Sequence, residues 1–310
     1  MRKFLGAAAG AAAGAALVVL GVGPGASVAA TPPAGTNLQV LSWNMCDVVR
    51  WGGCAERQTD AKVALLKQQV QQRYVQAMLL QEVCQSTLRK LTAELGPAWS
   101  VSFQPYHWSQ RGVITTVSPC ETKPGTSEPL DPNDDVGTAI VVKAGLSAPL
   151  KYPVVQPSTA LVPPFHCATA DYFEVRLCAV HSPRELSEED PDYPGLDYRD
   201  DYQLAVSDIV EDSPKVVFGG DFNTLPPDAG AKYAKVWKPA DLYSAFKECD
   251  QKNFPGRTGT ATHSSNTKLD YLFSNLKPRS CFVEPTAPEG QKNLSDHRFL
   301  VYSVEVAPSA

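Results

Sequence analysis

GGDFNT, at residues 219–224, is the most specific short segment of this chain. It overlaps the end of the apolar run at 216–219, which is typical of a short buried strand. Two glycines allow a ligand to approach the backbone closely. If the segment stays extended, Asp221 and Asn223 point the same way because they are two residues apart. A carboxylate beside an amide can orient a water molecule, although the same residues also form tight turns.

Two further polar side chains directly follow apolar, strand-like runs. Asn44 comes after the run at 37–43, and Glu82 comes after the run at 75–81. Amide and carboxylate oxygens are the ligands that Mg²⁺ and Ca²⁺ prefer. A carboxylate at the end of a buried strand is also costly unless it is paired or bound to a metal. We therefore expect both residues in a metal site, with an exposed Glu and a turn-forming Asn as the alternatives.

Histidines and a carboxylate complete the set of candidate catalytic residues. His297 stands in Ser295-Asp296-His297, and Asp270 stands in Leu-Asp-Tyr at 269–271. A carboxylate bonded to one imidazole nitrogen raises the basicity of the other, so Asp270 is expected to orient His297 as the base for the attacking water. His181 ends another strand-like run and is expected to donate a proton to the leaving oxygen or a hydrogen bond to a phosphate oxygen.

The remaining histidines, His107, His166 and His263, have no evident partner in the sequence and are not expected to be catalytic. Hydrolysis of a phosphate ester needs a divalent cation, an oriented water and a general base at one spot. The segments described above contain candidate residues to bind the cation, orient the water and act as the base.

The first 30 residues have the features of an export signal. A charged start at Arg2 and Lys3 precedes an uncharged stretch rich in Ala, Gly, Val and Leu, and small residues follow at Ser27, Ala29 and Ala30. This pattern predicts a signal peptide, residues 1–30, cleaved after Ala29 or Ala30, with a membrane anchor as the disfavoured alternative. We therefore expect a secreted protein. Residues 31–310 can form one large domain or two small ones.

Charge does not decide the substrate. The formal net charge is −5. Proteins that bind nucleic-acid phosphates usually carry a basic patch, so a mildly acidic chain does not favour such binding. Acidic metal ligands contribute to the same count, however, and a local basic strip remains compatible with it.

All eight cysteines follow residue 30, and an even number in an exported chain predicts disulfides. We expect neighbours to pair: Cys46–Cys54, Cys84–Cys120, Cys167–Cys178 and Cys249–Cys281. The first and third pairs are favoured because they close short loops. A zinc cluster is disfavoured by the lack of any C-x-x-C pair.

Periodicity predicts strands and helices mixed along the chain. Strands are expected at 37–43, 75–81, 138–143, 172–181, 216–219, 269–273 and 299–306, helices at 59–74, 86–95, 198–210 and 242–248, and a long loop or a small excursion at 106–135. Because the two types do not alternate strictly, mixed sheets packed face to face with helices outside are favoured. The candidate residues lie where strands end, the usual place for a site on such a scaffold.

Taken in order, the segments resemble the endonuclease/exonuclease/phosphatase superfamily, over residues 39–306. The resemblance rests on Asn44, Gln81-Glu82, His181, Gly-Asp-Phe-Asn at 220–223, Leu-Asp-Tyr at 269–271 and Ser-Asp-His at 295–297. It implies one α/β domain at 31–310: a four-layer α/β sandwich of two packed mixed β-sheets flanked by helices. It also implies Mg²⁺-dependent hydrolysis of phosphoesters, with Mn²⁺ or Ca²⁺ as alternative ions.

By this resemblance Glu82 is the principal metal ligand, Asn44 a metal- or phosphate-contacting amide, and Asp296 a further residue near the metal. The segment at 180–183 is similar to the His-bearing segment of pancreatic-type DNases and sphingomyelinases. Apurinic endonucleases usually carry Tyr there. Inositol-polyphosphate 5-phosphatases carry a Cys-Asp-Arg near the position of Asp270, which is followed here by Tyr271.

The resemblance leaves the substrate open. A sphingomyelinase needs exposed aromatic residues to enter a bilayer, and the candidates are Trp51, Tyr106 and Trp108, for which ordinary packing is the alternative. No Phe-Phe or Trp-Trp pair is present. We therefore expect a nucleic acid substrate and an extracellular endonuclease, ahead of a phospholipid substrate and a phospholipase C or sphingomyelinase activity. A third possibility is a non-catalytic exported binding module. No obligate protein partner is implied, and a monomer is expected.

Overall fold

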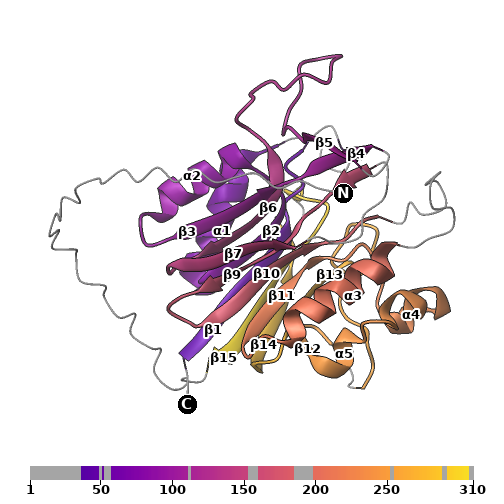
Figure 1. Ribbon diagram of the computed structural model, residues 1–310. Helices are drawn as coiled ribbons and strands as arrows, with labels where there is room; N and C mark the ends of the chain where they lie inside the picture. Colours follow the sequence, from indigo (N-terminus) through magenta and orange to yellow (C-terminus); the bar gives the residue numbers. More distant parts are fainter. Residues whose placement is uncertain are drawn as a thin grey trace, which may run out of the picture.

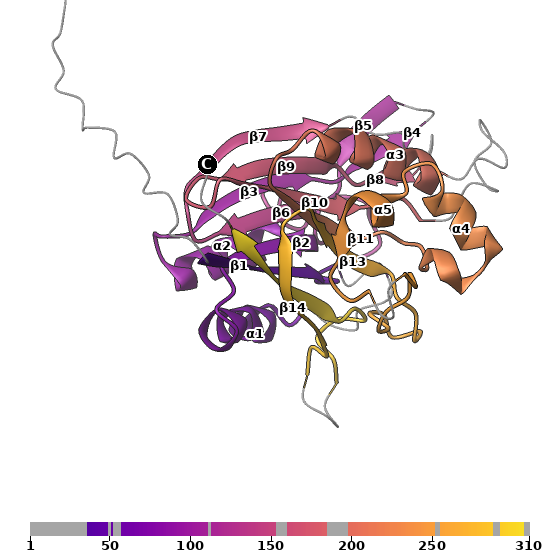
Figure 2. The same ribbon diagram turned by 90° about the horizontal axis from the view of Figure 1, so that it is seen from below.

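The computed structural model describes residues 36–48, 51, 57–110, 113–152, 160–184, 198–251, 255–287 and 292–306. Within these residues, two six-stranded mixed sheets pack face to face (Figure 1). Helices α1 and α2 lie on one side of the pair, and α3, α4 and α5 lie on the other (Figure 1 and Figure 2). The predicted four-layer sandwich is confirmed. The predicted signal peptide lies outside the described residues.

The first sheet has the strand order β14-β15-β1-β2-β6-β3. Its strands are β1 (Thr36–Asn44), β2 (Ala77–Cys84), β3 (Ser100–Pro105), β6 (Val136–Val142), β14 (Lys277–Glu284) and β15 (Phe299–Val306). β1 and β2 are parallel, and β1 is antiparallel to β15 on its other side. The outer face of this sheet is covered by α1 (Thr59–Gln72) and α2 (Gln85–Leu95).

The second sheet has the order β12-β13-β11-β10-β9-β7. Its strands are β7 (Leu146–Tyr152), β9 (Phe165–Ala170), β10 (Val175–His181), β11 (Val216–Asp221), β12 (Lys247–Glu248) and β13 (Asp270–Ser274). β10 and β11 are parallel, and β11 is antiparallel to β13. The helices on its outer face are α3 (Tyr198–Glu211), α4 (Ala231–Trp237) and α5 (Leu242–Ala245).

Strand periodicity fills three apolar layers at once. In β1, Leu38 and Val40 belong to the core between the sheets, whereas Leu41 and Trp43 belong to the core under α1 and α2. Successive side chains of a strand point to opposite faces, so one strand serves both cores. Under α3 to α5, aromatic rings dominate, as in the stacked pair Phe218 and Phe273, whose centroids are 5.4 Å apart.

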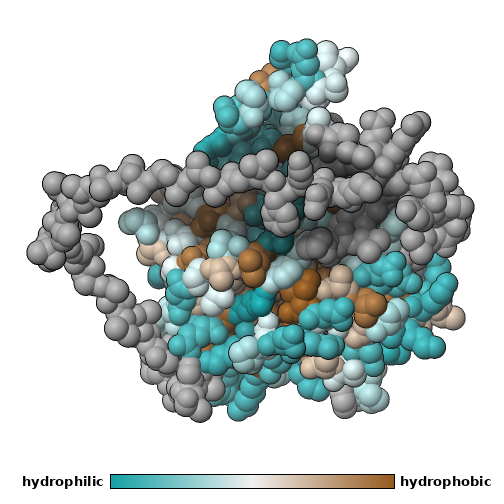
Figure 3. Space-filling view, in the orientation of Figure 1, coloured by the Kyte–Doolittle hydropathy of each residue, from teal (hydrophilic) through white to brown (hydrophobic). Residues whose placement is uncertain are grey.

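The segment at 106–135, predicted as a long loop or a small excursion, is not a plain loop. It contains β4 (His107–Gln110) and β5 (Val113–Val117), which form a small third sheet with β8 (Ala160–Val162). The rest, between β5 and β6, projects from the body of the molecule and carries mainly hydrophilic residues (Figure 1 and Figure 3). Two further boundaries differ: residues 171–174 form a turn before β10, and the helix predicted at 242–248 ends at Ala245, where β12 follows.

Three of the four predicted disulfides are present. Cys167–Cys178 joins neighbouring strands β9 and β10, and Cys84–Cys120 joins the end of β2 to the segment after β5. Cys249–Cys281 connects the residue after β12 to β14, and thus links the two sheets. Cys54, the predicted partner of Cys46, lies outside the described residues. In the described part of the chain, no helix is long and apolar enough to cross a membrane.

Candidate active site

The parallel strand pair of each sheet brings candidate residues from distant parts of the chain to one edge. Asn44 ends β1 and lies opposite Gln81 of β2. His181 ends β10 and lies opposite Asp221, the last residue of β11. Parallel strands end at the same edge of a sheet, so the polar residues that follow their apolar runs are gathered there.

An antiparallel neighbour of each pair adds a residue at its beginning. Asp270 is the first residue of β13 and lies opposite Asp221 of β11. His297 lies two residues before β15, which pairs with β1. An antiparallel strand begins where its neighbour ends. The first sheet therefore contributes Asn44, Glu82 and His297, and the second contributes His181, Asp221 and Asp270.

Glu82 reaches the site through an irregularity of β2. The pairing of β2 with β6 shifts register between Leu80 and Val83, and Glu82 has a positive φ of 50°. A left-handed conformation is uncommon for a residue other than glycine and is held only by surrounding contacts. Here the Asp47 N–H donates to the Glu82 carbonyl at 3.0 Å. This bulge places a carboxylate at the strand end, as expected of bulges beside active sites.

Asn44 links the two sheets through its amide. Its Nδ2 donates to Glu82 Oε1 and to Asp221 Oδ2, both at 3.2 Å, while its Oδ1 accepts from the Cys46 N–H at 3.1 Å. In this arrangement the amide N–H₂ group, not the oxygen, faces the two carboxylates. Asn44 therefore bridges them, and its role as a metal ligand stays a prediction.

His297 is bound from behind by a carboxylate. Its Nδ1 lies 2.8 Å from Asp270 Oδ2, and its Nε2 lies 3.8 Å from Asp221 Oδ2. Burial acts to lower the pKa of His297, but the negative charges of Asp270 and Asp221 outweigh it and raise that pKa to about 10. The predicted pairing of Asp270 with His297 is thus observed in the geometry.

His181 meets the same carboxylates in a different setting. Its Nε2 lies 3.8 Å from Asp221 Oδ2 and 3.9 Å from Glu82 Oε1. Burial lowers the pKa of His181 to about 4, although Asp221 acts against that shift. The imidazole is therefore neutral near pH 7, so it can accept a hydrogen bond on one nitrogen and donate on the other.

Tyr106 is a site residue that sequence reasoning did not assign. It is fully buried, its OH lies 2.6 Å from His181 Nδ1, and the same OH accepts the Glu82 backbone N–H at 3.0 Å. The packing interpretation of this aromatic is correct and the bilayer interpretation is wrong. In the sequence this tyrosine begins the segment at 106–135 that was not predicted as a strand or helix, and no local pattern there points to a residue 75 positions away.

The GGDFNT segment is more compact than expected. Asn223 has a φ of 48°, so the strand does not continue through it, and its backbone N–H donates to Asp221 Oδ1 at 2.8 Å. Its amide donates to the Ser182 carbonyl at 2.9 Å. The expectation that Asp221 and Asn223 project together from an extended segment is therefore wrong: the chain turns, and the two residues are joined by a local hydrogen bond.

The two glycines of this segment allow adjacent strands to pack closely against it. A Cβ on Gly220, where φ is 147°, would lie 1.9 Å from the Val180 carbonyl oxygen and 2.8 Å from Gln81 Nε2 of the opposite sheet. Close contact between the strands and between the sheets thus requires glycine here. The sequence-based explanation, close approach of a ligand, is replaced by close approach of the protein itself.

Asp296 has a second histidine beside it. His263 Nε2 lies 3.5 Å from Asp296 Oδ2, and the His263 and His297 rings are 4.7 Å apart. Burial acts to raise the pKa of Asp296, but the hydrogen bond from His263 helps to hold it below its usual value. His263 was not expected in the site. No local sequence pattern points to it. It reaches the site because the fold forms an isolated β-bridge between His263 and His297.

The donor set fits a hard divalent cation. Burial raises the pKa of the Glu82 carboxyl to about 7, although His297 opposes this, and Asp270 Oδ1 is buried without a hydrogen-bond partner in the described structure. Several carboxylates crowded into a buried space are compatible with a bound cation that compensates their charge. Carboxylate oxygens favour Mg²⁺, Ca²⁺ or Mn²⁺ over softer metals. Two groups here lie at metal-ligand distances: Asp221 with Asp270 and His297, and Asp296 with His263 and His297. Glu82 and Asp296 stay the predicted ligands, and the ion itself is not identified.

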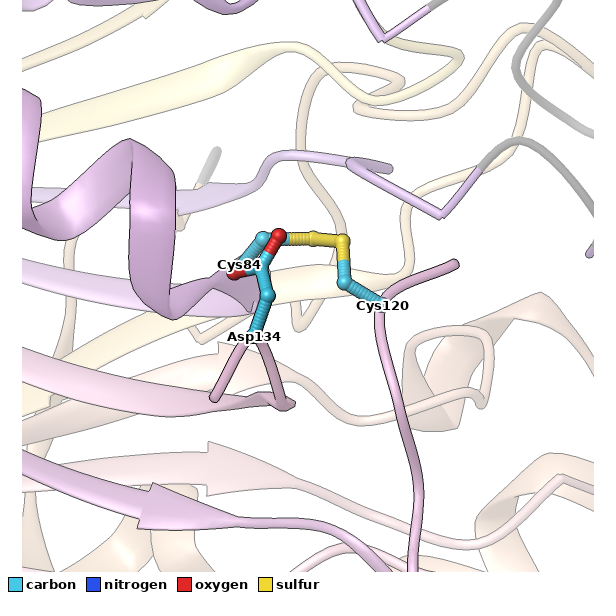
Figure 4. Close-up of side chains that lie close together, drawn as sticks. All are labelled: Cys84, Cys120 and Asp134. Carbon is cyan, nitrogen blue, oxygen red and sulfur yellow. A yellow bond between two sulfur atoms is a disulfide. The ribbon is translucent and has the colours of Figure 1, made fainter. Parts of the chain in front are cut away.

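A third group at metal-ligand distances, outside the site, is excluded by its chemistry. Cys84, Cys120 and Asp134 lie close together. Figure 4 shows that the two sulfur atoms are bonded to each other. A disulfide offers no thiolate, and thiolates are what zinc sites use.

Solved structures share this fold. An endonuclease/exonuclease/phosphatase from Beutenbergia cavernae DSM 12333 is 15% identical, with 87% of this chain and 72% of that chain covered and a TM-score of 0.64. A 3′ phosphatase, NExo, from Neisseria bound to a product DNA hairpin is 13% identical, with 86% and 99% covered and a TM-score of 0.54. The beta toxin of Staphylococcus aureus is 13% identical, with 86% and 99% covered and a TM-score of 0.52. The comparison with curated proteins gave no match.

A sequence model of the endonuclease/exonuclease/phosphatase family matches residues 41–297. This range includes every site residue described above, from Asn44 to His297. Members of the family are hydrolases of phosphoester bonds and generally use divalent metal ions. The match covers most of the chain, and the sheet order and the gathered strand ends agree with it. The chain belongs to the endonuclease/exonuclease/phosphatase family.

Proposed function

We propose that this protein is a secreted, Mg²⁺-dependent phosphodiesterase that cuts nucleic acid. The observation that carries the proposal is the meeting of Glu82, Asp221 and His297 at one edge of the two sheets, together with His181 and Asp270. A buried base, a cluster of carboxylates and a neutral histidine are the parts that phosphodiester hydrolysis requires.

His297 and Asp270 are the base in this proposal. Asp270 accepts a hydrogen bond from His297 Nδ1 at 2.8 Å and fixes the orientation of the ring. The Nε2 atom then faces the site, 3.8 Å from Asp221 Oδ2. With a pKa of about 10 the ring is protonated in the metal-free protein; a bound cation would offset the negative charge of the neighbouring carboxylates, lower that pKa and leave Nε2 free to act as the base. A water molecule held by Asp221 would then give its proton to Nε2 as the water oxygen attacks phosphorus. Asn223 holds Asp221 in place through its backbone N–H.

Glu82 and Asp296 supply the carboxylates for the cation. These residues would hold a divalent ion, whose charge would polarise the phosphate and offset the negative charge that develops on its oxygens. Asn44 keeps Glu82 and Asp221 at a fixed separation by donating to both. His181 presents Nε2 to the same space and binds an oxygen of the phosphate.

Three features support nucleic acid as the substrate. Tyr106 is buried, so one of the aromatics that a lipid-binding enzyme would use is engaged inside the protein. Trp51 stacks on Tyr106 with a centroid distance of 6.1 Å. A structural neighbour, the Neisseria 3′ phosphatase, was solved with a DNA hairpin.

A lipid phosphodiesterase is the second candidate, and a specific observation favours it. The small sheet directly follows Tyr106, and Trp108 and Val117 on it are 39% and 36% exposed. Exposed apolar side chains beside an active site can enter a bilayer surface. The beta toxin neighbour has the same fold.

Export and a monomeric state complete the proposal. Three disulfides in the described residues support an oxidising environment, because such bonds are rare in reducing compartments. The signal-peptide pattern at the beginning of the sequence points the same way.

The test is nicking of supercoiled plasmid by the oxidised protein with Mg²⁺, in parallel with release of phosphocholine from sphingomyelin vesicles. Glu82→Gln is the site variant. Glu128→Gln, at an exposed ion pair with Lys123, is its matched control. We expect nicking that EDTA and Glu82→Gln abolish and that Glu128→Gln retains.

Phosphocholine release without nicking would contradict the nuclease proposal and support the lipid phosphodiesterase. No hydrolysis of either substrate, or of a 4-nitrophenyl phosphodiester, by folded protein would contradict a phosphodiesterase function altogether.

A further inference from the structure

Tyr106 is buried and is held by backbone hydrogen bonds and by ring stacking. Its backbone N–H donates to the Val136 carbonyl at 2.9 Å, and its carbonyl accepts the Ser118 N–H at 2.8 Å. Its ring stacks on Trp51 at an interplanar angle of 8°. The residue lies between β3 and β4, so both flanking strands fix it. The hydroxyl is therefore a rigid part of the site.

The hydroxyl has one hydrogen and two neighbours. The Glu82 N–H is a donor, so the Tyr106 oxygen accepts there, at 3.0 Å. The other neighbour is His181 Nδ1 at 2.6 Å. If Nδ1 carried a proton, the hydroxyl hydrogen would have no acceptor among these neighbours, and a buried unmatched O–H is costly. The arrangement that satisfies all groups has Tyr106 donating to an unprotonated Nδ1.

The surroundings of the other nitrogen agree. His181 Nε2 lies 3.8 Å from Asp221 Oδ2 and 3.9 Å from Glu82 Oε1. Both groups are acceptors when ionised. A proton on Nε2 meets them favourably, whereas a lone pair there would face two carboxylates. Geometry at both nitrogens selects the tautomer with hydrogen on Nε2.

We propose that Tyr106 is a positioning residue that fixes His181 as the Nε2–H tautomer, so that His181 acts as a hydrogen-bond donor to a phosphate oxygen and not as a general acid. This inference rests on the proposed role of His181 in phosphodiester cleavage. Release of the Nε2 proton to a leaving oxygen would leave an imidazolate. The alternative is transfer of the Tyr106 proton to Nδ1, which leaves a buried tyrosinate. Donation of a hydrogen bond avoids both, since no proton leaves the histidine.

The same hydroxyl also connects His181 to the predicted metal ligand. Glu82 has a left-handed backbone, and its N–H is bound by Tyr106. One side chain thus sets the direction of the phosphate-binding N–H and supports the backbone of a carboxylate ligand. Loss of the hydroxyl affects both groups while the ring keeps its packing.

The direct test is ¹⁵N NMR of histidine-labelled, metal-free protein, with His181 assigned by His181→Gln. We expect a protonated Nε2 and an unprotonated Nδ1. Tyr106→Phe should give a mixture of tautomers. Tyr74→Phe, at a tyrosine that is 74% exposed, is the matched control and should leave the signals unchanged. A wild-type His181 protonated on Nδ1 would overturn the proposal, whatever happens to the variant.

Kinetics with two leaving groups tests the second part. A general acid matters most for a poor leaving group, so its removal would slow a dinucleoside phosphodiester far more than a 4-nitrophenyl ester. We expect His181→Gln to slow both substrates by the same factor, and Tyr106→Phe to lower kcat up to about tenfold with little change in KM. A loss confined to the dinucleotide would contradict the hydrogen-bond role. If the tautomer is as expected but the wild type cleaves no phosphodiester, the proposed function fails while the positioning of His181 stands.

Discussion

His181 and His297 lie in the same site, at the same distance from the same atom, and differ in what stands behind them. Each Nε2 is 3.8 Å from Asp221 Oδ2. Behind His297 is the carboxylate of Asp270, and behind His181 is the hydroxyl of Tyr106. The pKa of His297 is raised to about 10, and burial lowers the pKa of His181 to about 4.

The hydrogen-bond partner of Nδ1 thus determines the protonation state and the chemical role of each imidazole. A negative partner stabilises the protonated ring, so His297 holds a proton tightly in the metal-free protein. A neutral hydroxyl leaves the burial cost uncompensated, so the ring stays neutral and donates from one fixed nitrogen. Environments that separate the proton affinities of two similar groups are typical of acid–base sites.

The largest effect is expected from loss of the base. His297→Ala should lower kcat on the order of 10²–10⁴-fold, the usual contribution of an acid–base group. Hydrolysis of a 4-nitrophenyl phosphodiester measures the loss, with circular dichroism to confirm folding. His107→Ala, in the small sheet, should keep its activity. Full activity of a folded His297→Ala protein would remove His297 from the mechanism.

Replacement of the carboxylate that binds His297 Nδ1 should bring the pKa values of the two histidines closer together. Asp270→Asn removes the negative charge, so the pKa of His297 should fall by roughly 1 to 3 units. An NMR titration of metal-free protein measures this shift. Asp60→Asn, at an exposed carboxylate paired with Lys90, is the control and should change nothing. An unchanged pKa in Asp270→Asn would mean that Asp270 does not control His297.

The free energy of unfolding of the metal-free protein should decrease both above and below neutral pH. A histidine with a raised pKa causes the first decrease, and histidines with lowered pKa values cause the second. The raised pKa of His297 contributes stability below its unfolded value of 6.5, and that stability is lost as pH rises toward about 10. The lowered pKa values of His181 and of buried His166, both about 4, act in the other direction. Between pH 6.5 and about 4 these two histidines bind protons in the unfolded chain but not in the folded one. The free energy of unfolding therefore decreases as pH falls through this range.

Each of these histidines can contribute on the order of 3 kcal/mol, since one pKa unit is about 1.4 kcal/mol. Urea unfolding in EDTA at several pH values measures the profile. His181→Gln should flatten its acid side. A profile of the same shape in that variant would show that burial of His181 has no linkage to stability.

The smallest effect is expected at the edge of the site. His263 donates to Asp296, and hydrogen bonds to metal-binding carboxylates commonly contribute about tenfold in metal affinity. His263→Ala should therefore weaken Mg²⁺ binding by about tenfold, and His263→Gln, which retains an N–H donor, by less. Calorimetric titration with Mg²⁺ measures both. Equal binding by all three proteins would leave His263 as a structural neighbour only.

Much of the fold and site follows from local sequence because of where strands end. Asn44 and Glu82 directly follow apolar runs, His181 ends another, and Asp221 lies just beyond a fourth. Their approach could therefore be inferred from strand prediction and a resemblance. The strands that were missed include β3, β7 and β14, which lie at sheet edges and have mainly exposed or half-buried residues. Without two buried faces, they lack the periodicity that marks a strand.

What could not be inferred depends on contacts between distant segments. Tyr106 contacts His181, which is 75 positions away, and His263 contacts Asp296, which is 33 positions away. No local sequence pattern encodes these side-chain contacts. The turn at Asn223 and the bulge at Glu82 depend likewise on neighbours in space. The candidate reacting groups and the pairing of Asp270 with His297 were predicted from the sequence, and the structure adds the contacts of Tyr106 and His263.

The most direct test of the comparison is the protonation of both histidines in one ¹⁵N spectrum of the metal-free protein at about pH 8. The account predicts a doubly protonated His297 and a neutral His181 with its hydrogen on Nε2. Two neutral rings, or a charged His181 beside a neutral His297, would contradict the claim that Asp270 and Tyr106 give the two histidines opposite tasks.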